Sequence, residues 1–425
     1  MKVYIRPETS YYHIVRYVLK LIEKSVNHRF EFVDQIKDVE IIWDHEHPNS
    51  EPIATSFYNE LKTTSFNCDK KYFCNELGIL TEDNKKDPIA TIFFMVNCMQ
   101  EFNPGQDSLD AFGRFKYHSS YQAKFKNIDK NLVQEEIDIL TDKWRLTVTK
   151  TKSNFFISHD IDTIYGSFLQ DGFWALKKMK IGVILNLIAL ELSNKPHWKN
   201  IDRIIKIDSE VDIRSTFFWL VNKGTGIQNI KNADYNIKKE QGLLKLTEKA
   251  NFINGLHKSC STNGIDEELE ILGLSNCTYN RYHFLKFMPH DDWDKISDSN
   301  LRFDCSLGFA EHYGFRNSYG KAFQPFDFRN GKPHSFVEAP LNFMDGTFHK
   351  YMNTPRNEVA GIIIDMYKRN ATNCNFSLLW HNTYFTNYKY NSFINEYKKV
   401  MGFIYENKIQ CVTPDELINE NILAW

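Results

Sequence analysis

The stretch NFFISHDID, residues 154–162, decides how the rest of the chain is interpreted. Its first residues are apolar and favour a strand, and His159, Asp160 and Asp162 follow directly. Residues two apart on a strand point to the same face, so Asp160 and Asp162 can both reach one site. Two close carboxylates push their pKa values apart unless a cation lies between them. The stretch is therefore either a polar surface turn or the active-site end of a barrel strand.

Beyond Lys150, apolar strand-like runs alternate with helical stretches up to the sequence PDELINENI near the end of the chain. Strands alternating with helices predict parallel β/α units, and their number over residues 149–425 favours a barrel over an open sheet. In such barrels the chemistry lies at the carboxyl ends of the strands.

Residues 1–148 have a different pattern. The segment opens with the strand-like KVYI (2–5) and an amphipathic helix within 12–26, a second helix is expected within 88–102, and residues 135–146 close the unit. We predict a smaller α/β domain of unknown role over 1–148, followed by the barrel domain over 149–425.

Composition excludes several classes of protein. Hydrophobic residues make up 42% and charged residues 25% of the 425, as in ordinary soluble globular proteins. The net charge of −2 gives no basic field for nucleic acid. The 8 cysteines form no Cys-x-x-Cys pair, which argues against a structural zinc ribbon.

The most apolar run, residues 181–192, is too short to span a bilayer, and the first residues lack a signal-peptide pattern. We therefore expect a cytoplasmic protein without a transmembrane segment.

Polar residues follow the predicted strands in order. Each one alone is equally well explained as a satisfied polar group at a barrel rim, but the ordered set indicates a site. Neutral imidazole is a common zinc ligand, and a histidine beside a tryptophan at a strand end can donate a proton. Besides Asp160 and Asp162, the candidates are His257, Arg281, His283, Arg316, Asp345 and His381.

The region 153–385 resembles the polysaccharide deacetylase family, carbohydrate esterase family 4. The resemblance rests on SHDID, STFFWLV, GLHKSCS, GFRNSYGKAFQPF and LLWHN, in that order. RYH and MDGT make the chain similar to a cytoplasmic branch associated with surface-polysaccharide biosynthesis. DAFGRFKYHSS (110–120) resembles part of the domain that precedes the barrel in that branch.

The resemblance implies a distorted (β/α)-barrel of about seven strands and metal-dependent removal of N-acetyl groups from amino sugars. It makes Asp160 the general base and Asp162 and His257 metal ligands. It gives Arg316 the ion pair that holds the base, His381 the role of general acid, and Asp345 the role of orienting it. The implied metal is zinc, with cobalt, nickel or manganese also compatible.

One position departs from the family. The second histidine of the family's His-x-x-x-His motif falls at Ser261, and a hydroxyl is a poor replacement for imidazole. Either His283 supplies the third ligand, or the metal is weakly held or absent.

The expected partner is an N-acetylated sugar or glycan precursor; the sequence leaves the sugar, its linkage and the oligomeric state open. Two other functions stay open: an amide hydrolase acting on a small non-sugar substrate, and a non-catalytic barrel that binds glycans.

Overall fold

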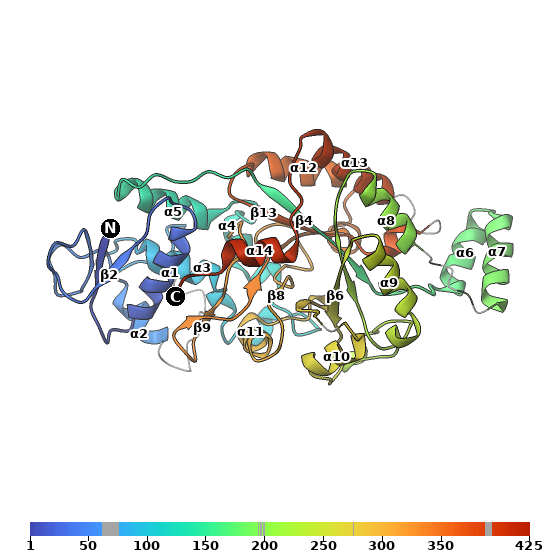
Figure 1. The fold of residues 1–425 in the computed structure, drawn as a ribbon, viewed down its shortest axis with the longest axis horizontal. Coiled ribbons are helices and arrows are strands. Elements are labelled where there is room, and N and C mark those ends of the chain that lie inside the picture. Colours follow the sequence, from blue (N-terminus) through green and yellow to red (C-terminus); the bar gives the residue numbers. More distant parts are fainter. Residues whose placement is uncertain (62–75, 194, 196–197, 199, 275, 387–392) are drawn as a thin grey trace.

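The computed structural model describes residues 1–61, 76–193, 195, 198, 200–274, 276–386 and 393–425. At its centre is an all-parallel sheet of eight strands in the order β11-β8-β7-β6-β5-β4-β13-β12, surrounded by helices (Figure 1). The predicted parallel α/β architecture is thus present. The strands are β4 (Asn154–Ile161), β5 (Thr216–Trp219), β6 (Ile253–Lys258), β7 (Tyr279–Tyr282), β8 (Phe303–Asp304), β11 (Val337–Glu338), β12 (Leu341–Met344) and β13 (Asn375–Leu379). The surrounding helices are α8 (Ile201–Ser209), α9 (Gln241–Lys249), α10 (Ile265–Leu272), α11 (Pro289–Ser297), α12 (Val359–Arg369) and α13 (Phe393–Glu406).

The two edges of this sheet meet at one segment of the chain. The outer strands β11 and β12 are separated by only Ala339 and Pro340, although β11 pairs with β8 and β12 pairs with β13. The amide of Leu341 in β12 also donates to the carbonyl of Leu307, just after β8, at 2.9 Å. Because so short a connection spans at most about 11 Å, the sheet curls round until its edges adjoin, as in a barrel.

The strand β4 is buried along its whole length. Phe155, Ile157 and Ile161 belong to the main core, which includes the outer helices, whereas Phe156 belongs to a second cluster inside the curled sheet. This period of two follows from strand geometry and places Ser158, Asp160 and Asp162 on the inner side with Phe156.

The amino-terminal end of the sheet is closed by apolar side chains. Phe156, Phe218 and Phe303 pack there against Leu417 and Ile418. The last two lie on α14 (Pro414–Asn421), which begins with a capping box between Thr413 and Glu416. The opposite, carboxyl end therefore holds the polar residues.

Residues 1–148 contain a small parallel sheet in the order β2-β1-β3, covered by helices. Its buried apolar residues are continuous with those of the larger sheet in one cluster, and Tyr17 donates to the carbonyl of Gln324 at 2.8 Å. The boundary at residue 148 stays a prediction. The elements are β1 (Lys2–Ile5), β2 (Glu31–Val33), β3 (Ile41–Trp43), α1 (Tyr12–Glu23), α2 (Thr55–Leu61), α3 (Pro88–Val96), α4 (Tyr121–Phe125) and α5 (Leu132–Lys143).

Two further helices, α6 (Phe168–Lys177) and α7 (Ile181–Leu192), form a hairpin that projects from one end of the molecule (Figure 1). Among the residues that the structure describes, no helix combines the length and the apolar character needed to cross a bilayer.

Candidate active site

The carboxyl end of the sheet gathers Asp160, Asp162, His257, His283 and His381. Asp160 comes from β4 and Asp162 from the residue after β4, His257 from β6, His283 from the residue after β7, and His381 from the second residue after β13. His257 Nε2 lies 3.4 Å from Asp160 Oδ2 and 3.5 Å from Asp162 Oδ1. Parallel strands in register bring their ends to one edge, which is why residues distant in the sequence meet here.

Asp160 is held by Arg281 of β7. One guanidinium nitrogen of Arg281 lies 3.0 Å from Asp160 Oδ1 and 2.8 Å from Ser158 Oγ, while Nε donates to the carbonyl of Cys305 at 3.1 Å. Both charged side chains are almost completely buried. This pair fixes one oxygen of Asp160 and leaves Oδ2 on the side of His257.

The prediction that Arg316 forms this ion pair is wrong. Arg316 instead contacts Glu101 through Nε at 3.0 Å and a terminal nitrogen at 2.5 Å, and it also donates to the carbonyl of Gly308. This buried pair joins the barrel to residues 1–148. The physical reason is register: Arg281 lies on a strand beside His257, whereas Arg316 lies in the segment after β8 that faces the N-terminal helices.

One ring nitrogen of His257 faces one ring nitrogen of His283 across the site. His257 Nδ1 and His283 Nε2 each lie 2.9 Å from a backbone carbonyl oxygen, those of Arg281 and Lys231. Because a carbonyl oxygen only accepts hydrogen bonds, these two nitrogens carry the protons. The other two nitrogens face each other at 3.0 Å. In neutral rings both carry lone pairs, and burial lowers the pKa of His283, which favours its neutral form.

Asp162 completes this cluster. Its Oδ1 lies 3.5 Å from both facing imidazole nitrogens, yet it is buried without a hydrogen-bond partner. Burial acts to raise the pKa of Asp162, but His283, His257 and His381 outweigh it and hold the pKa below its usual range. Two imidazole nitrogens and one carboxylate oxygen converge here within 4.8 Å of one another, the donor set of a three-ligand zinc site with an open position.

Ser261 takes no part in this cluster. Its hydroxyl donates to Glu268 at 2.8 Å, together with Ser259 and Lys258, on the outer side of the strand end. His283 occupies the place beside His257 that a third ligand needs. Ser261 lies beyond the end of β6 at Lys258, in the bend that leads to α10, so the two-residue alternation of the strand no longer fixes its side.

His381 and Asp345 form a second pair at the rim. His381 Nδ1 lies 2.7 Å from Asp345 Oδ1, and the His381 amide donates to Asp345 Oδ2 at 2.5 Å. Burial acts to lower the pKa of His381, but the carboxylates of Asp345, Asp162 and Asp160 raise it to about 9. His381 Nε2 points toward Asp162, 3.8 Å from its Oδ2. The raised pKa favours the protonated imidazole at neutral pH.

His159 lies on β4 but faces the outer helix α8, and its role is structural. Its Nε2 lies 3.1 Å from Asp208 Oδ2 and its Nδ1 donates to the carbonyl of Trp380 at 2.8 Å. Trp380 and Tyr384 are also buried, so they pack in the core and do not line a sugar site.

Aromatic residues at the rim come instead from three separate segments. Arg114 stacks near Phe112, Phe284 and Tyr351, with its guanidinium carbon 5.2, 5.4 and 5.9 Å from their ring centres. It also donates to the carbonyl of Phe284 at 2.8 Å. Phe284 directly follows His283, so residues 1–148 reach the edge of the site. The sequence does not predict the roles of Arg281 and Arg114. For Arg281, its spacing of two residues from His283 could have indicated that both side chains face the site.

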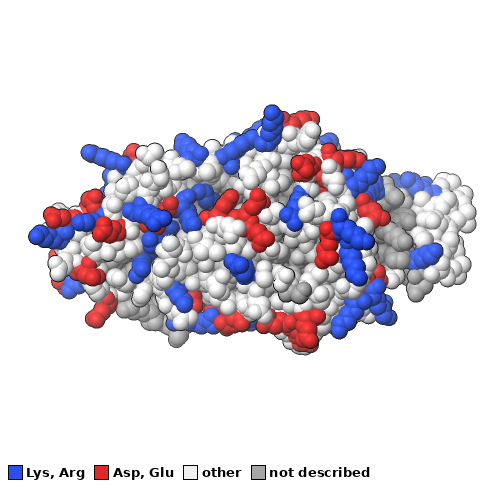
Figure 2. Space-filling view, in the orientation of Figure 1, with Lys and Arg blue, Asp and Glu red and all other residues white. Residues whose placement is uncertain are grey.

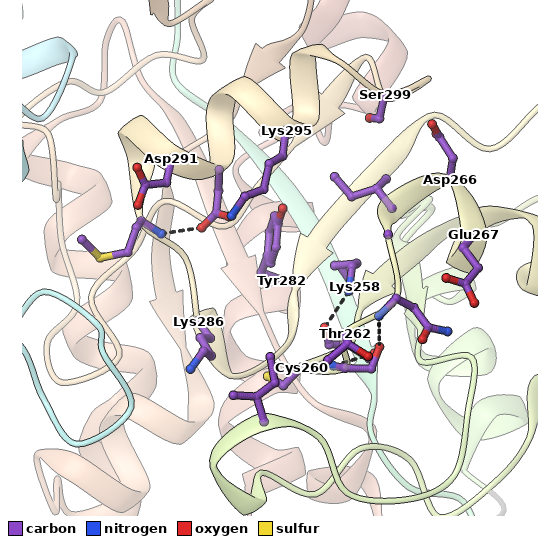
Figure 3. Close-up of a pocket in the computed structure, with 18 of the residues that line it drawn as sticks. Lys258, Cys260, Thr262, Asp266, Glu267, Tyr282, Lys286, Asp291, Lys295 and Ser299 are labelled. Atoms are coloured by element: carbon purple, nitrogen blue, oxygen red, sulfur yellow. Dashed lines mark hydrogen bonds and ion pairs between the residues drawn. The ribbon is translucent and has the colours of Figure 1, made fainter.

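A cavity of about 720 Å³ lies beside the site, not in it. Figure 3 shows Lys258, Cys260, Lys286 and Asp291 around it, between the ends of β6 and β7 and helices α10 and α11. Lys258 and Tyr282, which line it, alternate along their strands with His257 and Arg281, so the cavity lies outside the ring of strands.

A second group with metal-ligand geometry, Asp294, Asp327 and His334, lies away from the site. Arg329 Nε lies 3.1 Å from Asp294 and 3.5 Å from Asp327, so a guanidinium already supplies the positive charge there.

Comparison with known proteins gives three results. A family model described only as a family of unknown function (DUF7033) matches residues 1–148. No curated protein matches the chain. Among solved structures, a candidate polysaccharide deacetylase from Mycobacterium smegmatis aligns over 62% of this chain and 94% of its own, with 10% identity and a TM-score of 0.35.

A pseudoenzyme of the CE4 family from Bacillus anthracis aligns over 65% of this chain and 70% of its own, with 11% identity and a TM-score of 0.29. A mutant of that pseudoenzyme with restored enzymatic activity aligns over 65% and 72%, with 10% identity and a TM-score of 0.29.

Proposed function

We propose that the protein is a metal-dependent hydrolase that removes the N-acetyl group of an amino sugar, on a cytoplasmic precursor of a surface polysaccharide. One observation carries the proposal. Two facing imidazole nitrogens and an unpartnered oxygen of Asp162 converge between the Asp160 carboxylate, held by Arg281, and the His381 imidazole, held by Asp345. A base, an acid and a three-donor ligand set in one place fit amide hydrolysis.

Asp162, His257 and His283 would hold the metal. When bound, a divalent ion such as zinc polarises a carbonyl oxygen and lowers the pKa of a bound water. The backbone carbonyls of Arg281 and Lys231 fix which nitrogen of each imidazole faces the site, the role that outer hydrogen bonds play around metal ligands.

Asp160 would accept the proton of the attacking water. Arg281 and Ser158 hold its surroundings rigid, and only Oδ2 stays turned toward His257. Because the carboxylate is already held in one orientation, little conformational entropy is lost in positioning it during the reaction.

His381 would give a proton to the departing amine. An amide nitrogen leaves poorly as an anion, so the step needs an acid within reach. Asp345 keeps the imidazole protonated and oriented, with Nε2 turned into the site. Phe284 and Tyr351, both exposed at the rim, offer ring faces to a sugar.

The test measures metal content and turnover on the same preparations. Elemental analysis of the wild type should give about one divalent ion per chain. His257→Ala and His283→Ala should lose it, and the matched control Ser261→Ala should keep it. A wild type that binds no ion after incubation with zinc, cobalt, nickel or manganese would contradict the site.

Acetate release is then followed with N-acetylated amino sugars and, in parallel, small cyclic amides. Asp160→Asn should keep its metal and lose at least a hundredfold in kcat. A metal-loaded wild type that hydrolyses only the cyclic amides would reassign the substrate, and one that hydrolyses neither while binding the sugars would support the glycan-binding alternative.

A further inference from the structure

The α6–α7 hairpin, residues 167–193, emerges from the strand that carries the site. Only residues 163–166 separate β4 and Asp162 from the start of the hairpin. Asp234 pins this connection, since it accepts hydrogen bonds from the amides of Ile164, Tyr165 and Gly166 at 2.9 to 3.0 Å. The base of the hairpin is therefore fixed at the carboxyl end of the sheet, the end at which the candidate site opens.

The hairpin has a small core of its own. Leu187 and Trp198 are buried there against Phe168, Trp174 and Val183, in a cluster separate from the main core. Trp198 Nε1 donates to Asp171 at 2.7 Å, and a side chain at Gly166 would collide with the Trp198 ring. The two helices therefore pack on each other and on Trp198, which follows the hairpin, in a cluster separate from the main core.

The outer surface of the hairpin is apolar. A monomeric protein rarely exposes so many large apolar side chains together, and such a patch usually marks a binding surface. The most exposed are Met179 at 86%, Leu192 at 84% and Leu169 at 80%. The full set is Leu169, Phe173, Leu176, Met179, Ile181, Leu185, Ile188 and Leu192.

Lysines surround this surface where the two helices join. Lys177, Lys178 and Lys180 are exposed around Met179. Asp171 is buried against Trp198, and Glu191 lies at the far end of α7. Figure 2 shows the projecting lobe mostly white with blue patches. Apolar side chains beside a basic tip match the composition of segments that lie in the interface of an anionic membrane.

We propose that the α6–α7 hairpin docks the protein on an anionic lipid membrane, with its apolar face in the headgroup region. Its helices of 10 and 12 residues are too short to cross a bilayer, which leaves the interfacial mode. A second copy of the chain fits less well, because a protein interface of this kind would bring three lysines of each copy against apolar surface, where charged residues are depleted.

The docking bears on the substrate. It rests on the proposed function in one respect: a deacetylase whose site opens beside a membrane-bound hairpin would act on an amino sugar carried by a lipid in that membrane. The membrane contact itself needs neither the metal nor catalysis.

Co-sedimentation of the full chain with vesicles tests the docking. Vesicles of phosphatidylcholine and phosphatidylglycerol at 3:1 should bind the wild type, and pure phosphatidylcholine should bind it at least tenfold more weakly. The triple change Leu176→Ser, Met179→Ser and Leu185→Ser should cost at least tenfold on the mixed vesicles, as should Lys177→Gln, Lys178→Gln and Lys180→Gln together. Ile139→Ser, which removes an exposed isoleucine from α5, is the matched control and should change nothing.

The altered side chains are exposed, so circular dichroism and metal content should match those of the wild type. Equal vesicle binding by wild type and both triple variants would overturn the proposal. So would a wild-type dimer that ignores vesicles and becomes monomeric in the serine variant. Acetate release from a water-soluble substrate should be unchanged in the serine variant, so failure of the docking and failure of the proposed function are seen in different assays.

Discussion

At the scale of single residues, Arg281 is the side chain on which the site depends. It is fully buried, and its charge is balanced by Asp160, so removing it leaves a buried carboxylate without a partner. A second buried arginine pair, Arg316 with Glu101, has similar burial but lies away from the site.

These two arginines give a matched prediction. Arg281→Met and Arg316→Met should each lower the free energy of unfolding by about 3–5 kcal/mol, because each leaves one buried charge uncompensated. Urea unfolding measures both losses. Adding Asp160→Asn to Arg281→Met should restore much of the stability.

Turnover per folded molecule separates the two arginines. It should fall steeply in Arg281→Met and stay near the wild-type value in Arg316→Met. A loss of turnover in folded Arg316→Met would return Arg316 to the catalytic role that the sequence resemblance gave it.

A second residue-scale prediction concerns His381. Its pKa is about 9 in the folded chain against an ordinary 6.5, so the imidazolium stabilises the fold at low pH and this contribution is lost as the pH rises through 9. Asp345→Asn should bring the pKa down markedly, which an NMR titration of the metal-free protein measures. An unchanged pKa would mean that Asp345 does not hold the proton on His381.

At the scale of secondary-structure elements, the two ends of the curled sheet have different functions. α14 closes the amino end of the sheet with Leu417 and Ile418, while the polar residues occupy the carboxyl end. Stability and chemistry are therefore placed at opposite ends of the same strands.

This separation predicts that a substitution at the amino end of the sheet lowers stability without changing metal binding at the carboxyl end. Leu417→Ala should cost about 2–5 kcal/mol of unfolding free energy, because it leaves a cavity in a closed cluster. Metal content of the folded variant should not change. Asn419→Ala, on the exposed side of α14, is the control and should shift the melting temperature little. Metal loss in folded Leu417→Ala would show that the two ends are coupled.

How far the sequence predicts these elements depends on how local the cause is. The alternation within residues 154–162 is local, and it predicts that Asp160 and Asp162 reach one site, where both lie beside His257. The apolar run IQCVT, residues 409–413, has the composition of a strand, yet in the structure Cys411 makes only an isolated bridge to Phe155. Arg316 could not be placed, because its partner Glu101 lies 215 residues away and no spacing rule connects them. The exposure of the apolar face of α7 could not be predicted either, because an apolar run has the same sequence pattern whether it is buried or exposed.

At the scale of the whole molecule, residues 1–148 and the barrel share one core and several buried contacts. His290 on α11 lies at this junction, among Phe102, Trp293 and Phe328, and its Nε2 donates to the carbonyl of Cys98 at 3.2 Å. Burial lowers the pKa of His290 to about 4.

The junction should therefore weaken in acid. The pKa of His290 is about 4 in the folded chain, against an ordinary 6.5 when unfolded. Above pH 6.5 the free energy of unfolding is therefore unaffected by this histidine. As the pH falls from 6.5 toward 4, the free energy of unfolding decreases, by at most about 3 kcal/mol. Melting temperatures at pH 7.5 and pH 5 measure the loss. His290→Gln keeps a donor for Cys98 but cannot titrate there, so its melting temperature should fall less between the two values; an equal fall would place the acid sensitivity elsewhere.

The pairing of β4 with β13 has a consequence for synthesis on the ribosome. Ser158 of β4 bonds to Leu378 of β13, a residue made 220 positions later. At about 5–20 residues per second, one side of β4 remains an open edge for roughly 10 to 45 seconds after it has been translated. The nascent chain thus exposes one edge of an apolar strand through about half of its synthesis, and demand for chaperones should concentrate in that interval.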